Sequence, residues 1–285
     1  MLIGFPIWLG DRRKFEAKVR EAYDAGFDFI ELSFDYPWPI PDDLTPKRIA
    51  RFIRDMGLDL AIHGSWRDIR LASPINQVRE ASLDYVLRTL EIAKELKPRY
   101  VVFHVSTDQA VKEVEELEQL AIYAASQSVK RIVDLASKLG MTVLFENTPS
   151  QFGSSIEHMK RAVLSVEGSN ICLDIGHAQI QAMKLNNHVG VSVNDVVRKW
   201  VKELRLRILG VHVHDCVVRK SRVDEHIAPS MNSQSIRSLI DMIKSDNLRL
   251  KFIVIEAFKD TEGREASPSS LVDVIRQLRN LTSRN

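Results

Sequence analysis

The chain has 285 residues, of which 45% are hydrophobic and 27% charged, and this size and balance suit one domain over residues 1–285. A formal net charge of +2 does not mark a nucleic-acid-binding protein, which usually carries a concentrated basic face. No apolar run approaches the roughly 20 residues that span a bilayer, and the apolar first residues lack a basic leader. The two cysteines, Cys172 and Cys216, do not have Cys-x-x-Cys metal spacing. We therefore expect a reduced, cytoplasmic protein that makes no membrane contact.

From its start the chain alternates short apolar runs with amphipathic stretches. The first run is followed by a helical pattern that Asp11 can cap and that Gly26 can end. Gly57 and Gly140 end two later helical patterns in the same way. The runs are nearly continuous in apolar character, as expected for strands that are buried on both faces. In chain order, the eight predicted strands are Leu2–Ile7, Phe27–Ser33, Leu58–His63, Tyr100–Val105, Thr142–Glu146, Ile171–Ile175, Leu209–His214 and Phe252–Glu256. Eight strand–helix units predict an α/β fold with a single closed (β/α)8 TIM barrel.

Residue types that bind metals stand at the ends of seven of these eight strands. Because the carboxyl ends of parallel strands meet at one mouth of a closed barrel, residues far apart in the chain can lie close together there. The strand-end residues are Glu31, His63, His104, Glu146, Asp174 with His177 just beyond it, His212, and Glu256. The sequence therefore predicts a metal site at this mouth.

Four strand ends in the second half of the barrel form the tightest set: Glu146, Asp174, His212 and Glu256. Carboxylates with an imidazole make a hard, mostly oxygen site that suits Zn, Mn, Mg or Co. A carboxylate buried without a partner is costly, so packing alone does not explain four such groups. We expect one to three divalent ions.

A second set surrounds the first and consists of His63, His104, His177, Asp224 and His226. The spacings Asp174-x-x-His177 and Asp224-x-His226 place two ligands within one helical turn or one strand step, the second pair in a predicted loop. Each histidine could instead be a hydrogen-bonded residue of the core. His214 alternates with His212 and should also face the barrel interior.

Five segments together resemble the xylose isomerase-like TIM-barrel superfamily. They are His-Gly-Ser-Trp with Leu-Ala-Ser-Pro (63–74), Phe-Glu-Asn-Thr-Pro (145–149), Leu-Asp-Ile-Gly-His-Ala (173–178), Val-His-Val-His-Asp (211–215) and Asp-Glu-His-x-x-Pro (224–229). This superfamily contains sugar and sugar-phosphate isomerases and epimerases, and also endonuclease IV, which cuts DNA at abasic sites. The resemblance covers nearly the whole chain. It implies that the four residues of the tightest set hold a central metal.

The endonuclease branch further implies a cluster of three metals, and this chain has every ligand. His63, His104 and Glu146 would hold one ion, Asp174, His212 and Glu256 a second that Glu146 bridges to the first, and His177, Asp224 and His226 a third. Local differences favour the isomerase and epimerase branch, because the endonuclease branch usually has Asn at position 214 and Cys at position 176. The glycine-rich turn that commonly follows Asp-x-His in both branches is absent after His226.

We rank first a sugar or sugar-phosphate isomerase or epimerase. The metal would stabilise an enediolate, and the resemblance implies that Glu146 and Glu256 act as acid and base. The small-molecule sugar would contact Trp8, Trp66, Arg67 and His214, although both tryptophans could simply pack over the barrel rim.

Two alternatives stay open. The first is an endonuclease IV-like enzyme acting on abasic DNA, in which clustered zinc ions hydrolyse the backbone while Trp66 and Arg67 support a flipped nucleotide. The second is a member that binds a ligand without catalysis, which the altered residues after His226 favour. A homodimer is possible, since barrels of this kind often pair through helix faces.

Overall fold

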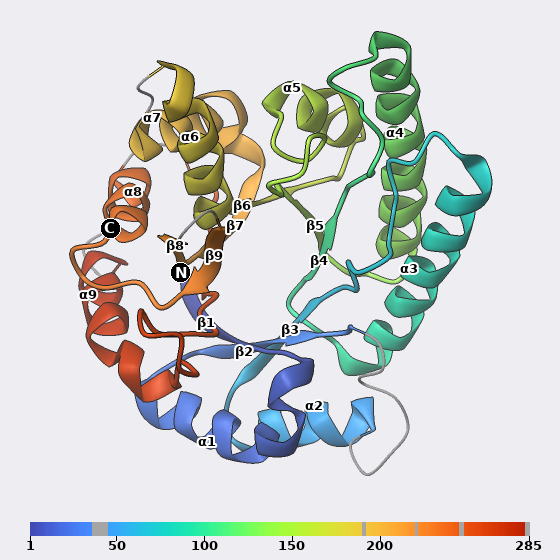
Figure 1. Ribbon diagram of the computed structural model, residues 1–285. Coiled ribbons are helices and arrows are strands. Elements are labelled where there is room, and N and C mark those ends of the chain that lie inside the picture. The colour runs from blue at the N-terminus through green and yellow to red at the C-terminus, as the bar shows by residue number, and fades with distance from the viewer. Residues whose placement is uncertain (36–44, 190–191, 220–221, 245–247, 283–285) are drawn as a thin grey trace.

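Eight parallel strands form a closed barrel surrounded by helices, which confirms the (β/α)8 prediction (Figure 1). The computed structural model describes residues 1–35, 45–189, 192–219, 222–244 and 248–282. The barrel strands are β1 (Leu2–Ile7), β2 (Phe29–Ser33), β3 (Asp59–His63), β4 (Val101–His104), β5 (Val143–Glu146), β6 (Ile171–Asp174), β7 (Ile208–Val213) and β10 (Phe252–Ile255). Their order is β1-β10-β7-β6-β5-β4-β3-β2, so each barrel strand lies beside the next one in the chain.

The helices cover the outside of the barrel (Figure 1). They are α1 (Phe15–Ala25), α2 (Pro46–Asp55), α3 (Asn76–Leu96), α4 (Glu115–Lys138), α5 (Ile156–His158), α6 (Ile175–Val189), α7 (Val193–Leu204), α8 (Gln234–Ile243) and α9 (Val272–Thr282). The predicted helix ends at Gly26, Gly57 and Gly140 are confirmed, with φ of 89°, 82° and 69° that glycine adopts without steric cost. The predicted cap at Asp11 is wrong: a 3-10 turn at Leu9–Lys14 precedes α1, and Asp11 pairs with a lysine of that helix. Within the described residues, no helix is long and apolar enough to cross a membrane.

The barrel interior changes from apolar to ionisable toward the carboxyl ends of the strands. Near the amino ends, the ring of Tyr100 packs against those of Phe29 and Phe252, at centroid distances of 6.1 and 4.8 Å. Gly4 leaves room for this layer, because a Cβ atom there would lie 2.3 Å from the Phe29 ring. Glu31 stands two residues beyond Phe29 on the same face of β2. The aromatic layer therefore separates the ionisable groups from the amino end of the barrel.

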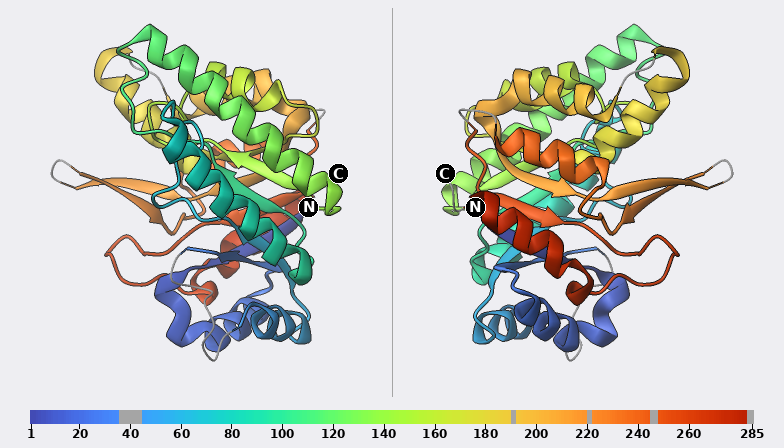
Figure 2. Two further views of the ribbon diagram at one scale, coloured as in Figure 1. Left: turned by 90° about the vertical axis from the view of Figure 1, so that its right-hand side faces the viewer. Right: turned by 90° about the vertical axis from the view of Figure 1, so that its left-hand side faces the viewer.

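An antiparallel hairpin of β8 (Asp215–Arg219) and β9 (Arg222–Ile227) follows β7 and extends from the barrel on the side away from both termini (Figure 2). The sequence predicted a loop for the part that carries Asp224 and His226, and that prediction is wrong. The pairing is irregular between Asp215 and Val217, and His226 has a positive φ of 57°. These two irregularities determine which hairpin side chains face the mouth.

Candidate metal centre

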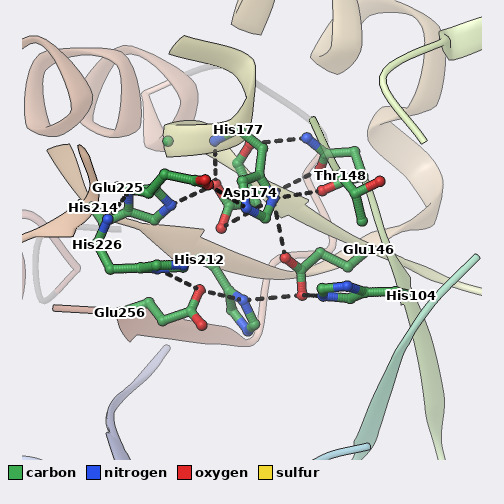
Figure 3. Close-up of polar contacts among 12 residues, drawn as sticks. His104, Glu146, Thr148, Asp174, His177, His212, His214, Glu225, His226 and Glu256 are labelled. Atoms are coloured by element: carbon green, nitrogen blue, oxygen red, sulfur yellow. Dashed lines mark hydrogen bonds and ion pairs between the residues drawn. The ribbon is translucent and has the colours of Figure 1, made fainter. Parts of the chain in front are cut away.

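The four residues of the tightest predicted set meet at the mouth of the barrel (Figure 3). Glu146 and Asp174 end β5 and β6, His212 lies in β7, and Glu256 directly follows β10. Their ligand atoms all lie within 4.8 Å of one another, and none of the four residues is more than 7% exposed. His212 Nδ1 is 3.2 Å from Glu146 Oε2 and 3.2 Å from Glu256 Oε2. The fold thus gathers three carboxylates and one imidazole around one point.

Unpaired buried polar atoms concentrate in this region. In the part of the chain that the structure describes, ten buried side-chain nitrogen and oxygen atoms have no hydrogen-bond partner, and eight of them belong to predicted site residues. These eight atoms are on His104, Glu146 (both oxygens), Asp174, His212, His214, His226 and Glu256. Because an unpaired buried polar atom is costly, this distribution fits side chains whose lone pairs are directed at cations.

His63 and His104 approach the same carboxylate from β3 and β4. The Nε2 atom of each lies 3.4 Å from Glu146 Oε2, and the three residues form a second group with ligand atoms within 4.8 Å of one another. His63 Nδ1 is 2.9 Å from the backbone oxygen of Gly64. Since that oxygen only accepts hydrogen bonds, Nδ1 carries a proton, and Nε2, which faces Glu146, is the atom that offers a lone pair when the ring is neutral. Glu146 therefore belongs both to this group and to the four-residue group, and it forms a further group with Cys172 and His212.

His177 is held beside Asp174 by the start of helix α6. The helix begins immediately after Asp174, whose Oδ1 accepts a 2.6 Å hydrogen bond from the backbone N–H of His177, as a capping residue does. His177 Nδ1 lies 2.8 Å from the backbone oxygen of Asn147, so Nδ1 carries a proton and Nε2 is the atom that offers a lone pair when the ring is neutral. The spacing of two residues between Asp174 and His177 thus follows from the geometry of a helix start.

Asn147 is a residue that sequence reasoning missed. Its side-chain amide donates to the backbone oxygen of Asp174 at 3.0 Å and accepts from the backbone N–H of Asp174 at 2.7 Å. Two bonds to one backbone unit fix the end of β6 against the end of β5. Its position directly after Glu146, in Phe-Glu-Asn, was the available signal.

His214 faces the interior as expected but contacts Asp174. His214 Nδ1 lies 3.1 Å from the backbone nitrogen of His226 and 3.2 Å from the backbone oxygen of Asp215, and Nε2 lies 3.4 Å from Asp174 Oδ1. His177, His214 and His226 are close enough to share an ion. His214 Nε2 faces the Asp174 carboxylate and has no hydrogen-bond partner among the described residues.

Asp224 is the one predicted ligand that the structure does not bring to the site. Its carboxylate forms a 3.0 Å ion pair with Arg219 on the neighbouring hairpin strand, and the side chain is 38% exposed. The adjacent Glu225 lines the mouth instead, with Oε2 at 3.6 Å from His177 Nε2 (Figure 3). Of the two adjacent carboxylates, Glu225 therefore lies at the mouth and Asp224 does not.

The ionisable groups of the cluster shift one another's pKa values. Burial opposes ionisation of Glu146, but His212 and the other nearby imidazoles outweigh it and hold the pKa of Glu146 well below its usual range. Burial also opposes the charged forms of His63 and His177, and the facing carboxylates raise both pKa values to about 9. Burial lowers the pKa of His226 to about 4. A cation that binds at neutral pH must therefore displace protons from His63 and His177.

A pocket of about 470 Å³ lies over the cluster, within the range of about 300–1,000 Å³ common for small-molecule sites. Trp66 is 39% exposed at its rim, and its ring lies 5.7 Å from that of His104. The Arg67 guanidinium lies 4.3 Å from the Trp66 ring centre and pairs with Asp35. Trp8 lines the same pocket. A second hollow of about 520 Å³ is lined by residues of α7 and α8 and by none of the candidate ligands.

Comparisons with known proteins agree with this architecture. The sequence matches the family model described as xylose isomerase-like TIM barrel over residues 19–281. A probable endonuclease 4 from Aquifex aeolicus (strain VF5) is 24% identical over 222 residues, which are 73% of this chain and 76% of that protein. A probable endonuclease 4 from Natranaerobius thermophilus is 29% identical over 173 residues, 56% of this chain and 58% of that relative.

Solved structures share the fold over the whole chain. A D-tagatose 3-epimerase-like protein has a TM-score of 0.70 at 19% identity, covering 100% of this chain and 99% of its own. Endonuclease IV from Thermus thermophilus has a TM-score of 0.64 at 20% identity, covering 100% of both chains. Likeness at these identities concerns the fold and does not select between the two activities. By the family match, this chain belongs to the xylose isomerase-like TIM-barrel family.

Proposed function

We propose that this chain is a divalent-metal-dependent hydrolase that cleaves DNA at abasic sites, in the manner of endonuclease IV. One observation carries the proposal: Glu146 connects a ligand group that contains His63 and His104 with another that contains Asp174, His212 and Glu256. A carboxylate shared by two groups suits a site with more than one cation. Sugar chemistry at a single cation needs only the second group. The names of the curated relatives favour the same choice.

The ligand set fits zinc best, with manganese and cobalt as substitutes, because imidazole is better suited to these metals than to magnesium. Bound cations would lower the pKa of a water molecule and neutralise the leaving oxygen of a phosphodiester. The protein contributes three buried carboxylates whose charges stay fixed at the mouth. His226, with its low pKa, stays neutral near pH 7 and can offer a lone pair beside Glu256, 3.8 Å away.

The rim supplies contacts that suit a flipped sugar-phosphate unit. Trp66 is partly exposed, and the Arg67 guanidinium lies over its ring. Asp35 is buried and pairs with Arg67, so the guanidinium is oriented before substrate binds. An aromatic face and an oriented guanidinium would support an extruded nucleotide and its phosphate.

A duplex with one abasic analogue tests the proposal. Zinc- or manganese-loaded protein should cut the damaged strand and leave an undamaged duplex intact, and a chelator should abolish the cutting. Glu146→Gln should remove the activity. Glu118→Gln is a matched control, because Glu118 pairs with His158 at 2.6 Å outside the site. A folded, metal-loaded protein that leaves the abasic duplex uncut would contradict the proposal.

One observation keeps sugar isomerase or epimerase activity as a second candidate. The Oε2 atoms of Glu146 and Glu256 both lie 3.2 Å from His212 Nδ1, so a small substrate held there would meet two carboxylates, as an acid/base pair requires. Incubation of ketoses and ketose phosphates in deuterated water provides the test, because proton abstraction beside the carbonyl incorporates deuterium. Deuterium incorporation without DNA cleavage would replace the first candidate. Metal binding with neither reaction would support a ligand-binding protein without catalysis.

A further inference from the structure

We propose that Glu31 is a positioning residue of the metal centre, which holds the His212 ring so that Nδ1 is directed at the cation. The inference rests on the metal site of the proposed function but not on the reaction that occurs there. Glu31 Oε1 and Oε2 lie 3.2 and 3.3 Å from His212 Nε2, on the edge of the ring remote from Glu146 and Glu256. The Glu31 carboxylate is therefore the outer partner of His212.

The surroundings of Glu31 leave it few other partners. The residue is 2% exposed, and its neighbours across the sheet, Pro6 and Ala61, have no polar side-chain atom. The Tyr100 hydroxyl donates a hydrogen bond to Oε2 of Glu31. Within the described residues, Tyr100 and His212 are thus the polar contacts of this buried carboxylate.

The hydrogen-bond inventory then decides the position of the imidazole proton. A carboxylate only accepts hydrogen bonds, so its contact with His212 is a bond only when Nε2 carries the proton. A singly protonated ring has its remaining lone pair on Nδ1, which is an atom without a hydrogen-bond partner and faces Glu146 and Glu256. Metal-binding histidines commonly donate their other ring N–H to a carboxylate or a carbonyl, which fixes the ring and raises its basicity.

His212 differs from its neighbours in the kind of outer partner. His63 and His177 bond to backbone oxygens, those of Gly64 and Asn147. The outer partner of His212 is instead the carboxylate of Glu31. This carboxylate accepts a hydrogen bond from Tyr100, which belongs to the aromatic layer. The relay from Tyr100 through Glu31 to His212 can therefore be broken by substitution without touching a ligand.

The test measures zinc affinity by chelator competition in Glu31→Gln and Tyr100→Phe. We expect the Kd for zinc to rise about 10–100-fold in Glu31→Gln, as is typical when an outer partner of a ligand is lost. Tyr100→Phe keeps the ring and the carboxylate, so it should cause a smaller rise in the same direction. Glu118→Gln, which removes the outer carboxylate of a histidine outside the site, should leave the Kd within about twofold of wild type.

Nitrogen-15 NMR of the zinc-loaded protein observes the ring nitrogens of His212 directly. A general loss of stability would not change these signals selectively. Zinc-bound His212 should carry its proton on Nε2 in both proteins, and the shift of this N–H should change in Glu31→Gln while the ring N–H shifts of His63 and His177 do not. An unchanged Kd in both variants, or an ion found bound to Glu31 itself, would overturn the inference. A wild type that binds zinc but cuts no abasic DNA would defeat only the proposed hydrolase. If Glu31→Gln cleaves abasic DNA fully and binds zinc as tightly as the wild type, only the role of Glu31 is disproved and the proposed hydrolase stands.

Discussion

The His214 ring occupies the space that a side chain at Gly176 would need, because a Cβ atom on Gly176 would lie 2.1 Å from Cε1 of that ring. His214 also joins the ligand Asp174 to the base of the hairpin, through Nε2 at 3.4 Å and through the backbone N–H of His226 at 3.1 Å. His226 has a φ of 57°, which is uncommon for a residue with a side chain. Positions 176 and 214 therefore act together in placing the hairpin against the metal centre.

This relationship predicts coupling between the two positions. Gly176→Ala should lower the free energy of unfolding by about 1–3 kcal/mol, the usual cost of overpacking a core. His214→Asn removes the ring, so adding it to Gly176→Ala should restore part of that loss. Urea denaturation of both single variants and the double variant gives the coupling energy. Strictly additive effects would show that the two residues do not compete for space.

The shared carboxylate predicts an unequal effect of ligand substitutions on metal content. Glu146→Gln should reduce zinc binding at both ligand groups, because its oxygens face His63, His104 and His212. His63→Gln should affect one group and leave the four-residue group able to bind. Atomic emission spectrometry of dialysed protein measures bound zinc per chain. Equal zinc content in these two variants would contradict a shared ligand.

The pKa shifts predict opposite effects of pH on the metal-free and metal-loaded protein. Facing carboxylates raise the pKa of His63 and His177 from 6.5 to about 9. A raised pKa in the folded state stabilises the protein below pH 6.5, and that stabilisation is lost as pH rises through about 9. The free energy of unfolding of metal-free protein should therefore fall over this window.

Zinc should reverse that trend, because fewer protons compete for the imidazoles as pH rises. Denaturation at both ends of the window, with zinc and with chelator, measures the two slopes. Glu146 and Glu256 have lowered pKa values, so they titrate at acid pH and do not contribute between pH 6.5 and 9. Parallel slopes with and without zinc would refute the prediction.

The hairpin predicts different roles for two adjacent carboxylates. Glu225→Gln should reduce zinc binding or abasic-site cleavage, since Glu225 faces His177 at 3.6 Å. Asp224→Asn should change stability by no more than about 1 kcal/mol, because an exposed ion pair contributes little. Each variant serves as the control for the other in a cleavage assay. A loss of activity confined to Asp224→Asn would support the ligand set implied by the family resemblance instead.

The exposed ring of Trp66 predicts an effect on substrate binding alone. Trp66→Ala should raise KM by an amount that corresponds to about 1–3 kcal/mol, the usual contribution of one stacking contact, here with a base next to the abasic site. The zinc Kd should not change, because Trp66 is not among the grouped ligand residues. Tyr123→Ala, at a residue of α4 that is 64% exposed, is a surface control. An unchanged KM would assign Trp66 to rim packing only.

The barrel and most of the site could be predicted from the sequence for one physical reason. A strand that is buried on both faces has few polar residues, so an ionisable group at its end, such as Glu146 or His212, is conspicuous. Closure of the barrel then determines where such groups meet. The sequence could not separate ligand from outer partner: Glu31 was grouped with the strand ends, yet it lies inside β2 and its carboxylate contacts the remote edge of His212.

The hairpin could not be predicted because its strands have neither a continuous apolar run nor a clear alternation. Successive side chains in a strand point to opposite faces of the sheet. The irregular pairing between Asp215 and Val217 shifts this alternation along the hairpin. This alternation decides whether Asp224 or Glu225 points toward the mouth. Asn147 was missed for another reason, since its contribution consists of bonds to backbone atoms of Asp174 that no spacing reveals.

Anomalous diffraction from crystals grown with zinc tests the central claim most directly, because it locates each ion without reference to activity. We predict at least two ions with Glu146 between them, one also contacting His63 and His104 and the other also contacting Asp174 and Glu256. A single ion held by the four-residue group, with His63 and His104 bare, would contradict the shared site and favour sugar chemistry.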